Sequence, residues 1–311
     1  MLDDLDTALG FAPDYDAAIP YMLRTREYYK AIGYTTPYRW AHYLAAPFHR
    51  LGKPLSQARV TLISTAAPFQ PGKGDQGPGA KYNGSAKFYD VLDYASDREH
   101  DTRIAHIGYD RKHTTATDSA SWFPHAQLRR AAAEGRIGAL APRFFGAPTN
   151  RSHRATVERD APTILARCRE DGVEAAVLVP NCPVCHQTLS LVARHLEANG
   201  IATVVLGCAK DIVEHAGVPR FLWSDFPLGN AAGRPHDPAS QAETLNLGLA
   251  LLEAAIGPRT TMQSPQRWAE DGTWKLDYLN LERISTDELA RLRAEFDRQK
   301  EAARAVAGKA A

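Results

Sequence analysis

Residues Ala175–Gln187 read AAVLVPNCPVCHQ, and this stretch contains the clearest structural signal in the chain. Its first part is an uninterrupted apolar run that stops at Pro180-Asn181, and two cysteines follow, Cys182 and Cys185. Beyond the cysteines, apolar residues recur at a spacing typical of a helix, at Leu189, Leu191, Val192 and Leu196. The pattern therefore predicts a buried strand that delivers both thiols to the first turn of a helix.

The first turn of a helix is an electropositive environment for a thiol. Its backbone N–H groups have no partner within the helix, and the helix dipole places partial positive charge at the same end. Such surroundings can lower the pKa of a cysteine from about 8.5 to between about 3.5 and 7.5. We therefore expect Cys182 to be ionised at neutral pH and to act as a nucleophile, with a second thiol one turn away.

The composition narrows the class of protein. The chain has 311 residues, of which 44% are hydrophobic and 23% charged, as is usual for a globular protein. Its 37 Lys and Arg against 36 Asp and Glu leave a formal net charge of +1, which indicates neither nucleic acid nor an anionic membrane surface as a partner. The first ten residues lack the basic start and apolar core of a signal peptide, and no apolar run has the length of a membrane span. We expect a cytoplasmic protein with four reduced cysteines, in which a close pair serves catalysis or metal binding.

Strand and helix patterns alternate between residues 102 and 255. The expected strands are 59–64, 102–107, 176–179, 202–206 and 220–223. The expected helices are 128–133, 155–170, the segment after Cys182, 210–215 and 240–255. This alternation predicts an α/β fold, with a mostly parallel sheet and helices on both of its faces.

Two further segments flank this alternation. We expect residues 1–258 to form an α/β catalytic domain that begins with a helical N-terminal segment, 1–55, and residues 259–311 to form a C-terminal extension. Residues 14–50 carry two aromatic-rich helical patterns. The extension ends in a charged helix at about 286–307, which has little apolar surface of its own to bury. We therefore expect an arm that wraps the domain or a partner subunit.

Reactive side chains lie at the carboxyl ends of three of the expected strands: His106, the Cys182 and Cys185 pair, and Cys208. In open parallel sheets, ligands bind outside the carboxyl ends of the strands, so we expect these side chains to converge. His106 is the candidate for proton transfer, because the charge of a histidine changes near neutral pH. Cys208 can equally be a small buried hydrophobe.

The segment after His106 adds further candidates. Asp110 or His113 would orient the His106 ring, and Tyr109 would contact the substrate beside them. In a second interpretation His106, Asp110 and His113 are metal ligands, although their spacing fits no common zinc pattern. In a third, the segment is a loop in which the histidines hydrogen-bond backbone groups.

The CPVCH motif itself permits four interpretations. Cys-x-x-Cys-His is the attachment signature of c-type haem, which we reject because no export signal is present and attachment would block the start of a helix. An iron–sulfur or zinc site using Cys182, Cys185 and Cys208 is the second, and a thioredoxin-like disulfide switch is the third. We favour the fourth, in which Cys182 is a nucleophile and Cys185 the thiol that resolves its adduct.

Around these residues the chain resembles the selenoprotein B family of glycine, sarcosine, betaine and D-proline reductases. The resemblance runs roughly from residue 101 to 257. It is carried by His106…Tyr109-Asp110, Leu128…Gly135-Arg-Ile-Gly138-Ala-Leu-Ala141, Asp171-Gly-Val, Cys182-Pro-Val-Cys185-His186-Gln187-Thr188, and Phe226…Asp237-Pro. In that family a selenocysteine, or in many relatives a cysteine, stands first in the U/C-x-x-C element. The resemblance implies that Cys182 is this nucleophile and Cys185 its resolving partner. It also implies reductive cleavage of a substrate, after which thiols reduce the oxidised pair.

Two departures from the family leave other functions open. Cysteine replaces selenocysteine, and Cys208 stands where we expect a small polar residue, so the family's amine substrates are not assumed here. Cysteines at two strand ends, Cys182 and Cys208, also resemble the two-cysteine aspartate/glutamate racemases, which exchange a proton without a cofactor. A redox- or metal-sensing protein that uses the same thiols as a switch is a third function.

The sequence thus predicts a thiol-dependent reductase in which Cys182 attacks a small molecule and Cys185 releases the product by forming a disulfide. Asn181 and the first-turn N–H groups would stabilise negative charge that develops in the reaction. Substrate contacts are expected from Asn181, Tyr109, Asp110, His113 and Cys208. No cofactor is expected beyond the redox-active cysteine pair. The expected partners are a small-molecule substrate and a thiol reductant, with self-association also allowed.

Overall fold

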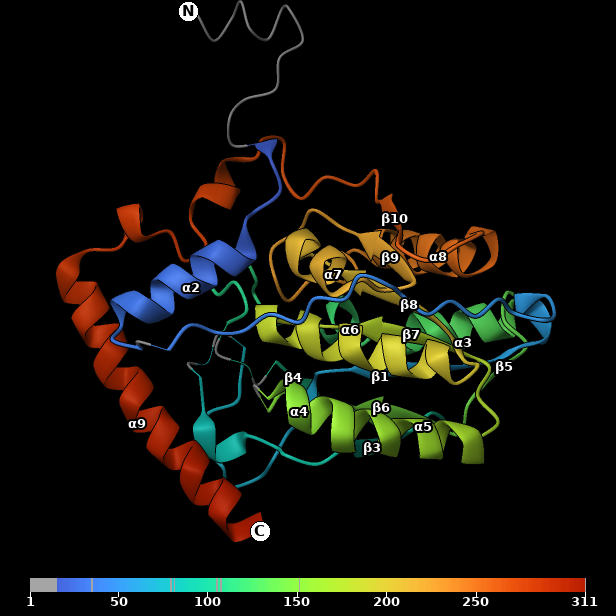
Figure 1. Cartoon of the computed structure of the whole chain (residues 1–311), viewed down its shortest axis with the longest axis horizontal. Coiled ribbons are helices and arrows are strands. Elements are labelled where there is room, and N and C mark those ends of the chain that lie inside the picture. The colour runs from blue at the N-terminus through green and yellow to red at the C-terminus, as the bar shows by residue number, and fades with distance from the viewer. Residues whose placement is uncertain are drawn as a thin grey trace, which may run out of the picture.

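The apolar run that precedes the cysteines is a strand at the centre of a mostly parallel sheet (Figure 1). The computed structural model describes residues 16–34, 36–78, 80, 82–104, 106, 108–150 and 152–310. Strand β7 (Ala175–Val179) is buried at every position and pairs in parallel with β1 (Arg59–Ser64) and β8 (Ala202–Gly207). All five residues of β7 are alanine, valine or leucine, as is usual for a strand that is covered on both faces.

Within the described residues the main sheet contains eight strands, in the order β10-β9-β8-β7-β1-β6-β3, with β5 also paired to β1. The remaining strands are β3 Leu92–Ala95, β5 Ala139–Leu140, β6 Arg143–Gly146, β9 Arg220–Trp223 and β10 Thr260–Gln263. Every pairing in this sheet is parallel except that of β3 with β6. The predicted α/β fold with a mostly parallel sheet is therefore confirmed.

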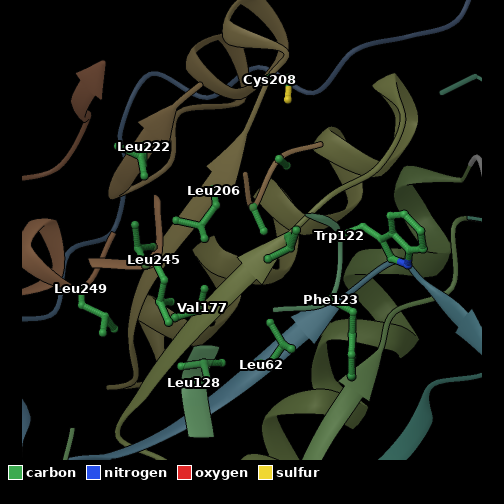
Figure 2. Close-up of a cluster of buried hydrophobic side chains, with 14 of the residues drawn as sticks. Leu62, Trp122, Phe123, Leu128, Val177, Leu206, Cys208, Leu222, Leu245 and Leu249 are labelled. Atoms are coloured by element: carbon green, nitrogen blue, oxygen red, sulfur yellow. The ribbon is translucent and has the colours of Figure 1, made fainter. Parts of the chain in front are cut away.

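One face of the sheet is covered by helices α3 (His125–Ala133) and α8 (Pro238–Ala254). Leu62, Val177 and Leu206, from three neighbouring strands, pack with leucines of these helices in one apolar cluster (Figure 2). Side chains alternate between the two faces of a strand, so their chain neighbours belong to the opposite face.

The opposite face has an apolar cluster of its own. Ile63, Leu178 and Val205 pack there against α5 (Ala161–Glu170) and α6 (Pro183–Ala198). Other elements near this face are α4 His153–Ala155, the π-helical turn Thr156–Asp160 and α7 Lys210–Ala216. The predicted placement of helices on both faces is also confirmed.

Only one of the two helices expected in residues 14–50 is present among the described residues. Helix α2 spans Tyr21–Ala31, whereas residues 36–54 contain no helix. Residues 1–15 of the expected helical N-terminal segment, 1–55, lie outside the described residues.

The segment 36–54 instead runs along α6. Its Ala41 N–H donates to the Gln187 side chain at 2.6 Å, and its His49 N–H donates to Glu197. Glu197 also accepts from the buried Arg220 guanidinium at 2.6 Å, which joins the segment to strand β9. These contacts replace the hydrogen bonds that a helix would have made.

The strand expected at 102–107 is shorter than predicted and lies outside the main sheet. Strand β4 (Thr102–Arg103) pairs in an antiparallel manner with β2 (Ala67–Pro68) in a separate two-stranded sheet. Residues 105 and 107 lie outside the described residues. The position beside β1 is taken by β6, whose two phenylalanines are fully buried and offer more apolar surface than Thr102–Arg103.

Helix α9 (Thr286–Ala310) runs along one side of the molecule beside α2 (Figure 1). Gln299 accepts a hydrogen bond from the Gly84 N–H at 2.9 Å, and the Tyr89 hydroxyl donates to the Ala303 carbonyl at 2.6 Å. A Cβ atom on Gly84 would lie 2.3 Å from the Gln299 carbonyl oxygen, so this close approach requires glycine. The helix is thus docked on the loop 82–89.

Short 3-10 turns complete the described elements, at Leu55–Gln57, Gly84–Ala86, Ser119–Ser121, Thr273–Leu276 and Leu281–Arg283. None of the described helices combines the length with the apolar character that a bilayer-spanning segment needs.

Candidate active site

Cys182 is the N-cap residue of α6. Its backbone is extended (φ −137°, ψ 171°), and its Sγ accepts a hydrogen bond from the Cys185 N–H at 3.2 Å. Pro183 occupies the first helical position, where the missing N–H costs no hydrogen bond. The thiol thus stands where a serine or aspartate usually caps a helix, as the sequence predicts.

His106 joins the two cysteines in one cluster. One ring nitrogen of His106 and the Sγ atoms of Cys182 and Cys185 all lie within 4.8 Å of one another. His106 Nε2 donates to the Thr65 carbonyl at 2.6 Å, which fixes the hydrogen on Nε2 and leaves Nδ1 for Cys185. The Thr149 hydroxyl donates to Cys185 Sγ at 3.5 Å. The structure therefore brings together three residues that the sequence placed at strand ends.

The surroundings of the cluster favour a negative charge on the deeper thiol, Cys185. Burial alone would raise the pKa of Cys185. The Cys182 thiol, the His106 imidazolium and the Thr149 hydroxyl nevertheless hold that pKa well below its ordinary value. Burial and the neighbouring Cys185 thiolate raise the pKa of Cys182 well above its ordinary value. The pKa of His106 is raised, because Cys185 and the Thr65 carbonyl outweigh the effect of burial.

The expectation that Cys182 is itself ionised at neutral pH is therefore wrong for the resting site. Two thiolates in contact repel each other, so the pair keeps one proton. Cys185 has the imidazolium beside it, and Cys182 has mainly backbone N–H groups. These surroundings favour a thiolate on Cys185, beside the His106 imidazolium, over a thiolate on Cys182.

A cavity of about 550 Å³ opens at Cys182. It lies between the first turn of α6, helix α2, the loop 82–89 and helix α9. Cys182, His106 and Thr149 line it, whereas Cys185 is fully buried and is not among its lining residues. The remaining wall is rich in aromatic rings, namely Tyr28, Tyr29, Tyr34, Tyr38, Tyr82, Tyr89, Tyr278 and Phe296. Cys182 therefore faces a space that can hold a small molecule, and Cys185 stands behind it.

His186, the last residue of CPVCH, has a structural contact that the sequence analysis missed. Its Nε2 accepts from the N–H groups of Cys208 and Ala209 at 3.0 and 3.2 Å, and its Nδ1 donates to the Cys182 carbonyl at 2.8 Å. Burial lowers the pKa of His186 to about 4, so the ring is neutral at physiological pH. The ring thus ties the end of β8 to the start of α6.

Cys208 does not join the cluster. Its Sγ lies 3.9 Å from the Pro227 carbonyl, and it packs in the same apolar cluster as Leu206 (Figure 2). Burial raises the pKa of its thiol. Cys208 is also absent from the lining of the cavity, so the alternative of a small buried hydrophobe describes its place better than a substrate contact.

The polar residues after His106 lie apart from the cavity wall. Asp110 is buried and accepts from the N–H groups of Lys112 and His113, which caps a turn. His113 Nε2 pairs with Asp277 at 3.0 Å, and the Tyr109 ring lies under the Arg111 guanidinium at 4.3 Å. The His106 ring is oriented by the Thr65 carbonyl and Cys185, in place of the expected Asp110 or His113.

Asn181 lies between β7 and the catalytic candidates. Its N–H donates to the Thr65 hydroxyl at 3.2 Å. Its side chain is fully buried, and both of its polar atoms lack a hydrogen-bond partner among the described residues. It is not among the residues that line the cavity.

The same cluster has the donors for a soft metal ion. Two thiolates and one imidazole resemble the protein ligands of open zinc sites, and the Thr65 carbonyl on the second ring nitrogen matches their usual outer partner. This set contains His106 in place of the Cys208 that the sequence analysis grouped with the pair. The expected trio of His106, Asp110 and His113 is not among the groups of described residues close enough to share an ion.

Two residues of the site, Thr65 and Thr149, escaped the sequence analysis. Thr65 directly follows β1, and Thr149 follows β6, which has only four residues. The available signal was their position after buried strands, the same signal that singled out Cys182.

Comparison with known proteins gives the relationships of the chain. Residues 31–181 match the family described as glycine/sarcosine/betaine reductase selenoprotein B, and the match ends one residue before Cys182. A D-proline reductase subunit gamma from Acetoanaerobium sticklandii is 32% identical over 144 residues, which cover 45% of this chain and 58% of the relative.

More distant relatives carry a second name. Glycine reductase complex component B subunit gamma from Carboxydothermus hydrogenoformans is 27% identical over 67% of this chain and 47% of its own length. Its counterpart from Symbiobacterium thermophilum is 26% identical over 66% and 48%. The chain thus spans about half the length of the curated relatives it matches. No solved structure matches.

Proposed function

Because this chain is related to the selenoprotein B family of reductases, we propose that it is a thiol-dependent reductase that cleaves a small molecule reductively. One observation carries the proposal: Cys182 and His106 line a cavity, and the Sγ atom of the buried Cys185 lies within 4.8 Å of the Cys182 Sγ atom and of a His106 ring nitrogen. The names of the relatives, subunits of D-proline reductase and of a glycine reductase complex, support a reductase role.

The first step uses the resting thiolate as a base. Cys185 takes the proton of Cys182, and the new Cys182 thiolate attacks an electrophilic carbon of the substrate. A sulfur–carbon bond forms, the bond from carbon to the leaving group breaks, and the leaving group departs with its electron pair. The N–H groups of the first turn of α6 stabilise the attacking thiolate.

The second step releases the product. The His106 imidazolium gives its proton to the leaving group, and the neutral ring then takes the proton from Cys185. The Cys185 thiolate attacks the sulfur of Cys182. A disulfide forms, the sulfur–carbon bond breaks, and the carbon takes the electron pair and one proton. Such a carbon must be activated, as next to a carbonyl group. The proton of the His106 imidazolium goes to the leaving group, and the proton that began on Cys182 reaches the carbon through Cys185 and His106. The substrate is thus reduced by two electrons and the cysteine pair is oxidised.

An external dithiol then reduces the Cys182–Cys185 disulfide by thiol–disulfide exchange. This cycle needs no cofactor, because the cysteine pair carries both electrons. The relatives are named as subunits of reductases, and we propose that a partner subunit or a small redox protein supplies the dithiol.

A single-turnover experiment tests this function with 4-(chloroacetyl)benzoate, a probe with a chloride leaving group next to a carbonyl. The reduced wild-type chain, freed of small thiols, should convert the probe into 4-acetylbenzoate and end as a disulfide, read by intact mass. Cys185→Ser should stop at a covalent adduct on Cys182, and Cys182→Ser should give no product. Cys208→Ser is the matched control and should behave as wild type. Product formation by Cys182→Ser, or a stable adduct on the wild type, would contradict the function.

The two alternative functions gain less support. A two-cysteine racemase needs Cys182 and Cys208 on opposite sides of one substrate, and Cys208 is not among the residues that line the cavity. A metal-sensing role would use the His106, Cys182 and Cys185 cluster. Metal analysis of the purified chain separates it from the reductase, since stoichiometric metal that blocks reaction of Cys182 with the probe would favour sensing.

A further inference from the structure

The cavity at Cys182 has an uneven distribution of charge. Its described lining contains four cationic side chains, and no aspartate or glutamate is among them. The four are Arg39, Lys87, Lys300 and Arg304. In a partly enclosed space with low-dielectric walls, charges of one sign attract and orient ligands of the other sign.

Lys300 shows how this charge is presented. Its Nζ lies 4.3 Å from the centre of the Tyr34 ring and donates to the Tyr34 hydroxyl at 3.2 Å. The ammonium also lies 5.9 Å from the centre of the Phe296 ring. These neighbours are aromatic and uncharged, so the positive charge of Lys300 is not neutralised by them. The Lys300 ammonium itself occupies the ring face of Tyr34, where a cation of a substrate would otherwise bind.

Helix α9 supplies this part of the wall. Phe296, Lys300, Ala303 and Ala307 line the cavity at intervals of four, three and four residues, which places them on one face of the helix. Arg304 lies beside them and is exposed. Contacts of Gln299 and Ala303 with the loop 82–89 hold the helix in place.

From these observations we infer that α9 makes the site selective for an anionic substrate with an apolar body. The class comprises carboxylates, sulfonates and phosphonates without an ammonium group, because the described lining offers no carboxylate to pair with one. Lys300 and Arg304 bind the anion, the tyrosine rings contact the apolar part, and the reacting carbon lies at Cys182. The inference rests on the proposed function in that Cys182 is the reacting group.

The test measures how fast Cys182 reacts with three methanethiosulfonates that differ in charge. The reagents carry a sulfonatoethyl group (negative), a methyl group (neutral) or a trimethylammonioethyl group (positive). The chain carries Cys185→Ser, so that Cys185 cannot remove the label, and peptide mass mapping assigns the label to Cys182. Each rate constant is divided by that of the same reagent with free 2-mercaptoethanol. This readout needs no turnover, so failure of the reductase function leaves it intact.

At low salt we expect the negative reagent to react at least about tenfold faster than the positive one after this correction. Lys300→Gln with Arg304→Gln should reduce the ratio to about threefold or less, while Lys300→Arg should keep it. Arg298→Gln removes an exposed charge of the same helix that does not line the cavity, and should leave the ratio unchanged. Equal rates for the two charged reagents, a ratio that survives the double variant, or a failure of Cys182 to react with the neutral reagent would overturn the inference.

Discussion

Cys182 and Cys208 each follow a buried strand of the same sheet, but their surroundings differ. Cys182, after β7, caps a helix and lines a cavity, with His106 and Cys185 beside it. Cys208, after β8, is packed among leucines, and the neutral imidazole of His186 accepts from its backbone N–H group. A strand followed by a cysteine thus indicates where a thiol lies, while its neighbours determine whether it can react.

The largest expected difference between the two regions is in activity. Cys182→Ser should lower the rate of 4-acetylbenzoate formation by at least about 1000-fold, because a hydroxyl is a far weaker nucleophile at neutral pH. Cys208→Ser should change the rate by less than about threefold. Product analysis by liquid chromatography measures both. Comparable losses in the two variants would remove the distinction between the regions.

The neutral His186 predicts a pH dependence of stability. Its folded pKa, about 4, lies below its ordinary value of 6.5, so the unfolded chain binds more protons between these values. The contribution of the neutral ring is complete above about pH 6.5 and is lost as the pH falls towards 4, by up to about 3 kcal/mol. Urea unfolding across this range measures it. In His186→Gln the slope should flatten, and an unchanged slope would assign the dependence to other groups.

The region of Cys182 contains a positively charged imidazole, that of His106, whereas the imidazole near Cys208 is neutral. His106→Asn removes the imidazolium beside Cys185, and we expect about a 100-fold loss in the rate of product formation. The variant should also raise the pKa of Cys185, since the neighbouring positive charge is lost. A rate profile against pH tests both effects. A loss of rate without a shift of the profile to higher pH would leave His106 with a merely structural role.

The smallest expected effect concerns Thr149, whose hydroxyl donates to Cys185. The folded pKa of Cys185 is depressed, so its thiolate absorbance in the ultraviolet should be present at neutral pH and disappear as the pH falls through that pKa. Thr149→Val should move this loss to higher pH by less than about one unit, as expected for one hydrogen bond. Cys185→Ser should lack the signal, and Cys208→Ser should retain it. A signal that depends on Cys182 instead would place the resting thiolate on the other sulfur.

The centre of the fold was predictable because β1, β7, β8 and β9 are rich in β-branched and apolar residues, and periodic helices follow β7 and β8. The edge strands β3 (LDYA) and β10 (TTMQ) contain polar residues and are only partly buried, so they give no comparable signal. The prediction of a second N-terminal helix was wrong, because it gave more weight to the spacing of the aromatic residues than to the prolines at 37 and 47.

At the site, position was more predictable than charge. The sequence placed His106 near the cysteine pair, although the backbone that carries it lies outside the main sheet. The prediction from the sequence placed the thiolate on Cys182, because the start of a helix, and with it the helix dipole, can be recognised in a sequence. Burial and the contact of Cys185 with His106 and Thr149 depend on distant segments, so their effect on the two pKa values emerges only in three dimensions.

Among the segments that form the cavity, the start of α6 supplies the sulfur chemistry, and α9 supplies another part of the wall. A substitution on the inner face of α9 leaves the backbone of the cysteine motif untouched. The range of accepted molecules can therefore drift during evolution while the reaction is preserved. For engineering, this division means that residues on the inner face of α9 can be varied in a library to change the binding surface, while the pair of cysteines stays unchanged.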